Sequence, residues 1–245
     1  TIHLSIVIPA FNEARRLPAT LAAITKFVGN RFPIEVIVVD DGSTDATSAV
    51  AASFAGVTVI RNPGNVGKGH SVRRGVLAAR GEFILVSDAD GSAPISEYEK
   101  LAAALDAGTD IAIGSRDMPD SIVSPRQAWH RRLIATLFRA IRRRRFLPAL
   151  RDTQCGFKLY RRAVAHEIFS RQTLVGWLFD CEVLALAAER GYRIIEVGIR
   201  WRNDPSSRVR MFADFGRTLR EYRVLTARFG KGRTPAGRRK AARNG

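Results

Sequence analysis

The first 125 residues alternate short apolar runs with amphipathic stretches, and this alternation is the strongest constraint on the fold. The apolar runs are LSIVIPA (4–10), IEVIVVDD (34–41), VTVIRN (57–62), FILVSDAD (83–90) and DIAIGSR (110–116). Runs that are apolar almost throughout, rather than at every second residue, are typical of strands covered by helices on both faces. The sequence therefore predicts an α/β fold with a doubly wound, mostly parallel sheet.

Polar residues follow four of the predicted strands. They form the segments PAFNE (9–13), DDGSTD (40–45), DADGS (88–92) and GSRD (114–117). Ligands of doubly wound sheets bind at the carboxyl ends of the strands, so these segments should converge on one crevice. The intervening helices are predicted at residues 13–29, 45–55, 68–80 and 96–107.

Two pairs of aspartates stand at the ends of predicted strands. Asp88 and Asp90 are one residue apart, and on an extended chain they would point to the same side. A cation between them would relieve their repulsion, and carboxylate oxygens suit Mg²⁺ or Mn²⁺. The alternative is an ordinary exposed loop. Asp40 and Asp41 either cap the following helix or accept hydrogen bonds from the base or ribose of a nucleotide.

Two common nucleotide-binding motifs are absent from the sequence. The stretch GNVGKGHS (64–71) contains a lysine followed by glycine, so it does not match the G-x-x-x-x-G-K-[ST] phosphate loop. No G-x-G-x-x-G follows the first strand, which disfavours a dinucleotide-dependent dehydrogenase. Lys68 either positions the turn into the next helix or reaches a phosphate.

Positive charge is concentrated in the second half of the chain. Residues 1–125 hold 11 Lys and Arg against 14 Asp and Glu, whereas residues 126–245 hold 29 against 9. The second half should therefore attract anions such as nucleic acid, anionic lipid or phosphorylated small molecules. Residues 126–146 read as a basic amphipathic helix, which either lies in a membrane interface or packs its apolar face on the domain. Residues 230–245 are predicted to be a disordered basic tail.

Neither the cysteines nor the apolar runs indicate secretion or a membrane span. Cys155 and Cys181 have no C-x-x-C spacing, so we expect them to be packing thiols in a reducing compartment. The longest apolar runs fall short of the roughly 20 residues that a spanning helix needs, and no signal peptide opens the sequence. We expect a soluble or peripheral protein.

Several motifs together resemble a known enzyme family. SIVIPAFNE, VIVVDDGSTD, NPGNVGKGHSVRRG and DADGS resemble the nucleotide-sugar-binding half of family 2 glycosyltransferases, which have the GT-A fold. GSR (114–116), RDTQCGFKLYRR (151–162) and GWLFDCEVL (176–184) are similar to the subgroup that charges a dolichyl or other polyprenyl phosphate, above all the dolichyl-phosphate β-glucosyltransferases. The resemblance spans residues 4 to about 210. It implies one domain over residues 1–229, with a nucleotide-sugar half at 1–125 and an acceptor-binding, membrane-facing half at 126–229.

The resemblance also implies roles for individual residues. It gives Asp90 to the metal, Mg²⁺ or Mn²⁺, with Asp88 beside it or facing the ribose or sugar. It gives the reacting centre to Arg116, Asp152 and Asp180. The implied donor-binding residues are Pro9, Ala10, Asn12, Glu13, Asp40, Asp41, Lys68, Asp88, Gln154 and Arg208, and the implied acceptor-phosphate residues are Arg131 and Lys158.

The implied reaction is an inverting transfer of glucose from UDP-glucose to a dolichyl or other polyprenyl phosphate. It would take place on the cytoplasmic face of a membrane, where the basic half would contact anionic lipid. A GDP-mannose-dependent polyprenyl-phosphate mannosyltransferase is the alternative, because sequence distinguishes sugar epimers poorly. A basic nucleic-acid-binding protein is disfavoured: arginines in 126–146 lie beside aliphatic residues rather than aromatic ones, and such a protein has no use for the acidic cluster.

Overall fold

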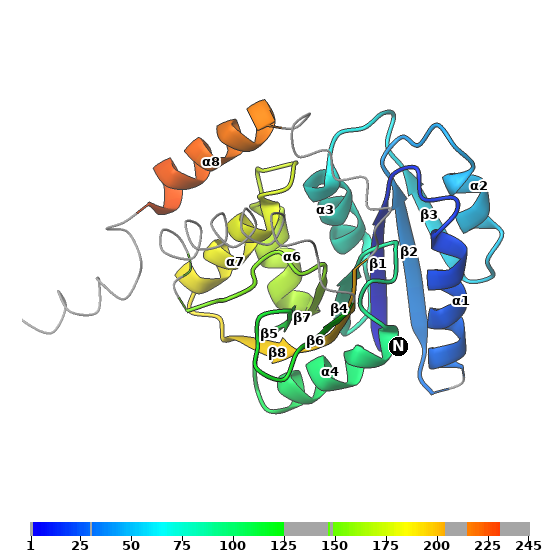
Figure 1. Cartoon of the computed structure of the whole chain (residues 1–245), viewed down its shortest axis with the longest axis horizontal. Helices are drawn as coiled ribbons and strands as arrows, with labels where there is room; N and C mark the ends of the chain where they lie inside the picture. The colour runs from blue at the N-terminus through cyan, green and yellow to red at the C-terminus, as the bar shows by residue number, and fades with distance from the viewer. Residues whose placement is uncertain (1, 30, 125–146, 148, 204–214, 231–245) are drawn as a thin grey trace, which may run out of the picture.

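The computed structural model describes residues 2–29, 31–124, 147, 149–203 and 215–230 (Figure 1). A seven-stranded sheet with the order β3-β2-β1-β4-β7-β5-β8 forms its centre. Its strands are β1 (Leu4–Ala10), β2 (Ile34–Asp40), β3 (Val57–Arg61), β4 (Phe83–Ser87), β5 (Ile111–Ser115), β7 (Phe157–Arg161) and β8 (Ile194–Gly198). The strands β6 (Ile122–Ser124) and β9 (Arg200–Arg202) form a separate parallel pair.

Helices cover both faces of the main sheet. One face carries α1 (Leu17–Val28), α2 (Thr47–Ala52) and α4 (Tyr98–Asp106), which follows the short 3₁₀ helix η1 (Ile95–Glu97). The other face carries α3 (Lys68–Ala78), α6 (Arg162–Ser170) and α7 (Phe179–Glu189), and α8 (Phe215–Phe229) packs outside α7. The prediction of a doubly wound, mostly parallel sheet is confirmed.

Strand β1 shows why almost all of its residues are apolar. Leu4, Ile6 and Ile8 belong to the core beneath α1 and α4, whereas Val7 belongs to the core beneath α3. All four side chains are fully buried. Because successive side chains of a strand point to opposite faces, a strand buried on both faces is apolar almost throughout. The polar side chain of Ser5 is also buried, and it donates a hydrogen bond of 2.6 Å to Glu35.

Strand β7 departs from the parallel arrangement. It lies between β4 and β5 and runs antiparallel to both, with Leu85 opposite Leu159 and Ile111 opposite Tyr160. Because of this reversal, the residues that precede β7 lie at the same edge of the sheet as the carboxyl ends of β4 and β5. At that edge β1 also lies between β2 and β4, which is where the strand order reverses and where ligands of such sheets bind.

Some predicted elements have other limits in the structure. Strand β4 ends at Ser87, so Asp88 and Asp90 lie in the turn that follows rather than on an extended strand as predicted. Residues 194–202 contain two strands, β8 and β9, which belong to different sheets. The predicted helix 126–146 and all but the first residue of the predicted tail 230–245 lie outside the described residues. Within the described part of the chain, no helix combines the length and apolarity needed to cross a bilayer.

Candidate active site

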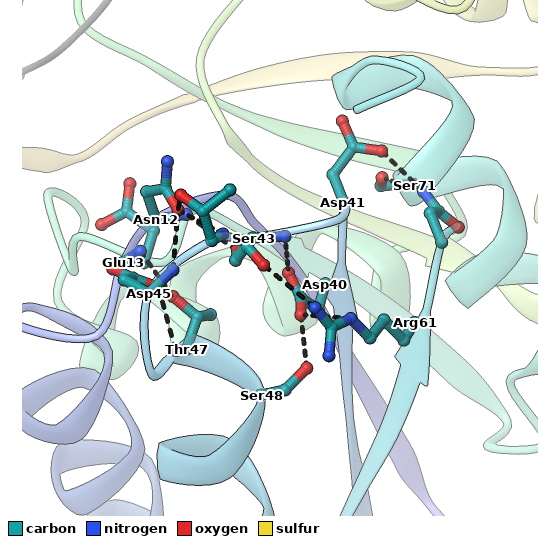
Figure 2. Close-up of polar contacts among 12 residues, drawn as sticks. Asn12, Glu13, Asp40, Asp41, Ser43, Asp45, Thr47, Ser48, Arg61 and Ser71 are labelled. Carbon is teal, nitrogen blue, oxygen red and sulfur yellow. Dashed lines mark hydrogen bonds and ion pairs between the residues drawn. The ribbon is translucent and has the colours of Figure 1, made fainter. Parts of the chain in front are cut away.

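The loops that follow β1 and β2 are tied together by Asn12. Its φ of 56° is in the left-handed region, which asparagine tolerates better than most residues. The Asn12 side-chain oxygen accepts the backbone N–H of Thr44 at 2.9 Å, and the Asn12 N–H donates to the hydroxyl of Ser43 at 2.9 Å (Figure 2). Asn12 therefore fixes the two loops relative to each other at the carboxyl edge of the sheet.

Asp40 ends β2 and is completely buried. Its carboxylate accepts the N–H of Ser43 at 2.9 Å and the hydroxyl of Ser48, and it lies 3.6 Å from Nε of Arg61 (Figure 2). These contacts hold the turn into α2. The predicted contact between Asp40 and the base or ribose of a nucleotide stays a prediction.

Asp41 points to the other side of the strand end, toward α3 (Figure 2). One carboxylate oxygen accepts Nδ2 of Asn62 at 2.6 Å, and the other accepts the N–H of Gly67 at 2.9 Å. The backbone N–H of Asp41 donates to the carbonyl of Ala10 at 2.8 Å. Asp41 thus holds the loop before α3, which places Lys68 at the start of that helix. Its predicted contact with the donor also stays a prediction.

Three carboxylates gather where β1 and β4 end: Glu13, Asp88 and Asp90. Burial raises the pKa of Glu13, and the charges of Asp90 and Asp88 add to this effect, while Arg16 opposes it. Arg16 forms an ion pair with Glu13, and its guanidinium also lies 3.9 Å from Asp90. The cluster is therefore a local concentration of negative charge in a chain with a net charge of +17.

Asp88 and Asp90 have different partners. Asp88 accepts Nζ of Lys68 at 2.5 Å, and Asp90 accepts the N–H of Ser92 at 2.9 Å. Their side chains are 24% and 18% exposed, so both carboxylates are reachable from solvent. Among the described residues, no three His, Cys, Asp or Glu side chains are arranged to hold a metal ion by themselves. Two carboxylates at an open edge do fit a Mg²⁺-like ion that completes its shell with phosphate oxygens and water.

Lys68 places a positive charge beside these carboxylates. Burial would lower the pKa of Lys68, but the charges of Asp88 and Asp180 outweigh burial and raise it, so the amine stays protonated. Its Nζ lies 5.6 Å from the centre of the Trp177 ring, a distance at which a cation and an aromatic face attract each other. The site thus contains a fixed cation suited to a phosphate.

Arg116 follows β5 and is held by Asp152. The guanidinium donates to the two carboxylate oxygens at 2.7 and 2.8 Å, and the Arg116 backbone N–H donates at 3.1 Å. Burial alone would raise the pKa of Asp152, but the charge and hydrogen bonds of Arg116 lower it to about 2. Arg116 also lies over the Trp201 ring at 4.9 Å. The carboxylate is therefore permanently ionised and committed to Arg116.

Lys158 and Asp180 form a second ion pair, beneath the site. Nζ of Lys158 donates to Asp180 at 2.6 Å and to the carbonyl of Cys155 at 2.5 Å, and Lys158 is only 1% exposed. Burial raises the pKa of Asp180, against the opposing charges of Lys158 and Lys68. The predicted contact between Lys158 and the acceptor phosphate stays a prediction, and the structure places its amine in the floor of the site.

The other predicted site residues divide into those at the edge and those outside the described part. Pro9 and Ala10 are buried at the end of β1. Gln154 donates from Nε2 to the carbonyl of Trp177 at 3.3 Å, so it contacts the residue whose ring lies beside the Lys68 cation. Arg131 and Arg208 lie outside the described residues.

Gly156 is a further site residue, and it was not predicted from the sequence. A methyl group at this position would overlap the Asp88 carboxylate, so only glycine leaves room for Asp88 as it is placed. The available signal was its place in the QCGFK stretch, immediately before β7, the strand that begins at the site.

Solved structures show the same fold. Glucosyl-3-phosphoglycerate synthase from Mycobacterium tuberculosis, in complex with Mn²⁺, UDP and phosphoglyceric acid, superposes with a TM-score of 0.70 at 21% identity. The match covers 94% of this chain and 79% of that chain. The likeness defines the fold, which is of the GT-A type.

The family follows from the sequence comparisons. The chain belongs to glycosyl transferase family 2, whose model matches residues 5–169. A dolichyl-phosphate beta-glucosyltransferase of Drosophila melanogaster is 34% identical over 249 residues, which cover 94% of this chain and 76% of the relative. The Homo sapiens enzyme of the same name is 36% identical over 219 residues, covering 82% and 68%. The family expected from the motifs is confirmed.

Proposed function

We propose that the chain transfers glucose from UDP-glucose to the phosphate of dolichyl phosphate or another polyprenyl phosphate, with inversion at the sugar. The observation that carries this proposal is the Asp88 and Asp90 pair beside Lys68, at the edge where β1 and β4 lie side by side. Relatives at 34% and 36% identity, both named dolichyl-phosphate beta-glucosyltransferases, support glucose as the sugar and a polyprenyl phosphate as the acceptor.

The acidic pair is assigned to a divalent cation, Mg²⁺ or Mn²⁺, with Asp90 as the principal ligand and Asp88 beside it. When bound, this cation would neutralise negative charge on the diphosphate of the donor. Lys68 and Arg116 supply further positive charge, and each is held by a carboxylate at hydrogen-bond distance. Cations that are already fixed in place need no reorganisation when charge develops on a leaving diphosphate.

In the reaction, an oxygen of the acceptor phosphate bonds to the anomeric carbon of glucose. The bond from that carbon to the UDP oxygen breaks, and its electron pair leaves with UDP. A phosphate monoester is already anionic at neutral pH, so no strong base is required. The low pKa of Asp152, about 2, makes its carboxylate a poor base, which is consistent with a reaction that needs none. We assign Asp152 to holding Arg116, and Asp180 to holding Lys158.

The side chains on the outer face of α8 support the proposal that the enzyme acts at a membrane surface. Arg220 and Arg223 are exposed on it, together with Leu219 and Val224, each 41% exposed. A helix that exposes arginines beside aliphatic side chains is typical of contact with anionic lipid. We propose that the enzyme binds the cytoplasmic face of a membrane, where a lipid-borne phosphate is presented.

The test is a transfer assay with a short polyprenyl phosphate, Mg²⁺ or Mn²⁺, and radiolabelled nucleotide sugars. We expect label from UDP-glucose, and not from GDP-mannose, in the lipid fraction. Asp90→Ala should lower transfer by about a hundredfold or more, since it removes a ligand that stabilises the leaving diphosphate. The matched control is Asp106→Ala, which removes an exposed carboxylate at the end of α4.

Two results would contradict the proposal. One is transfer of label from GDP-mannose alone. The other is a folded Asp90→Ala variant that keeps most of its activity, which would remove Asp90 from the metal site.

A further inference from the structure

The loop of residues 173–178 connects α6 to α7 and lies against the donor side of the site. The Trp177 ring lies 5.6 Å from Nζ of Lys68, and the Trp177 carbonyl accepts Nε2 of Gln154 at 3.3 Å. Further along α3, the N–H of His70 donates to the carbonyl of Val175 at 3.2 Å. The position of this loop therefore determines what surrounds the Lys68 cation.

A buried carboxylate from α8 holds the loop on either side of Trp177. One oxygen of Glu221 accepts the N–H of Gly176 at 2.6 Å, and the other accepts the N–H of Leu178 at 3.1 Å. Glu221 is only 5% exposed. Within the described residues it forms no ion pair, so its charge is balanced by backbone donors of the loop. A buried carboxylate used in this way is costly unless these bonds persist.

A second carboxylate holds the start of the same loop and links it to α8. Glu182 of α7 accepts the N–H of Thr173 at 2.9 Å and the N–H of Leu174 at 2.8 Å. It also accepts a hydrogen bond of 2.8 Å from Arg228 of α8. The loop is thus fixed from α7 and α8 together, and α8 lies toward the carboxyl end of the sheet (Figure 1).

We infer that Glu221 is a positioning residue for nucleotide-sugar binding. By holding Gly176 and Leu178, it places Trp177 over Lys68 and so fixes the cation that meets the donor phosphates. Donor binding then depends on the docking of α8, a helix that carries none of the residues assigned to the donor. The inference rests on the proposed function for the identity of the donor, but not for the loop geometry.

Two substitutions break this contact from opposite sides. Glu221→Gln keeps the shape of the side chain but puts an amide N–H₂ against one of the two N–H donors. Gly176→Ala adds a methyl group that would lie 2.5 Å from an oxygen of Glu221, displacing the carboxylate. The matched control is Glu189→Gln, an exposed glutamate at the end of α7.

For both variants we expect KM for UDP-glucose to rise about tenfold, with kcat within about twofold, because the lost contact serves binding rather than the chemical step. Hydrogen exchange of residues 173–178 should be faster in both variants and unchanged in Glu189→Gln. When Glu221→Ala precedes it, Gly176→Ala should have little further effect, because the atoms it would strike are gone. Should Glu221→Ala not fold, Glu221→Gln and Gly176→Ala still test the inference.

The inference is overturned if Glu221→Gln and Gly176→Ala exchange faster over residues 173–178 but keep the wild-type KM. It is also overturned if neither variant changes that exchange. A further arm measures the affinity for UDP with Mn²⁺ by calorimetry, which should fall about tenfold in both variants. Because UDP lacks the sugar that is transferred, the calorimetry and the hydrogen exchange test the inference even if glucose proves to be the wrong sugar.

Discussion

Asp152 illustrates, at the scale of single residues, how this site keeps its charges fixed. It is buried to 1% exposure and accepts three hydrogen bonds from Arg116. Its own N–H and that of Arg151 donate to Glu196 of β8 at 2.8 and 2.7 Å. A buried ion pair is stabilising only when its remaining hydrogen-bonding capacity is used, as it is here.

The ion pair between Asp152 and Arg116 should make the free energy of unfolding depend on pH in the acid range. Its folded pKa of about 2 lies below the ordinary value of 3.8, so the stabilisation is present above about pH 4 and is lost as pH falls through 2. We expect the free energy of unfolding of the wild type to fall by about 2 kcal/mol more than that of Asp152→Asn between pH 4 and pH 2. Urea denaturation at a series of pH values measures this difference.

The Asp152→Asn protein should also be less stable at pH 7, because Arg116 loses its partner. The control is Asp106→Asn, whose stability should follow the wild-type pH dependence. Parallel curves for the wild type and Asp152→Asn would show that the carboxylate does not titrate as described.

Gly156 gives a second prediction at this scale. In Gly156→Ala the new methyl group would overlap the Asp88 carboxylate, which must then leave Lys68 or move away from Asp90. We expect Mn²⁺-dependent binding of UDP, measured by calorimetry, to weaken by about tenfold or more. Gly216→Ala is the control, because a methyl group there meets nothing within 4 Å. Unchanged binding in Gly156→Ala would mean that Asp88 does not need its present position.

At the scale of elements, the predicted strands of the first half agree with β1 to β5 to within a few residues. Their almost unbroken apolar runs are dictated by burial on both faces, and that signal is local. Strand β7 was not predicted, because FKLYR is short and contains Lys158, which is buried only by virtue of Asp180. The direction of a strand within its sheet depends on the path of the chain, which hydrophobicity does not report.

The same distinction applies to the site. Strand ends and motifs predicted the edge of the sheet at which Asp88, Asp90, Lys68 and Arg116 lie. The pairing of Arg116 with Asp152, like that of Lys158 with Asp180, joins residues far apart in the chain and required the sheet order. The burial of Glu221 could have been predicted from the sequence. Glu221, Leu225 and Phe229 are spaced four residues apart, and these three form the buried side of α8.

At the scale of the whole molecule, the acidic site and the exposed arginines of α8 lie toward the same end of the sheet. The acidic edge belongs to the first half of the chain, which holds 14 acidic against 11 basic residues, whereas residues 126–245 hold 29 basic against 9 acidic. The exposed arginines of α8 belong to this basic part and lie toward the site end of the sheet (Figure 1). Attraction to an anionic surface would therefore turn the site toward the lipid phosphate.

This arrangement predicts binding to anionic vesicles. The wild type should float with vesicles that contain phosphatidylserine at low salt and not with neutral ones. Replacing Arg220 and Arg223 by Gln should weaken vesicle binding by about thirtyfold, since each arginine near the surface contributes about 1 kcal/mol. Lys26→Gln with Arg193→Gln, at the opposite edge of the sheet, is the matched control. Equal flotation of the two double variants would exclude α8 as the contact.

The position of β5 has a consequence for how such enzymes diversify. It belongs to the motif-rich first part of the sequence, yet its hydrogen-bonding neighbours, β7 and β8, both come from residues after 150. A junction placed between the two parts would leave β5 without neighbours and β4 with an open side. Hybrids with altered acceptor preference are therefore better built by grafting loops onto an intact framework than by exchanging whole segments.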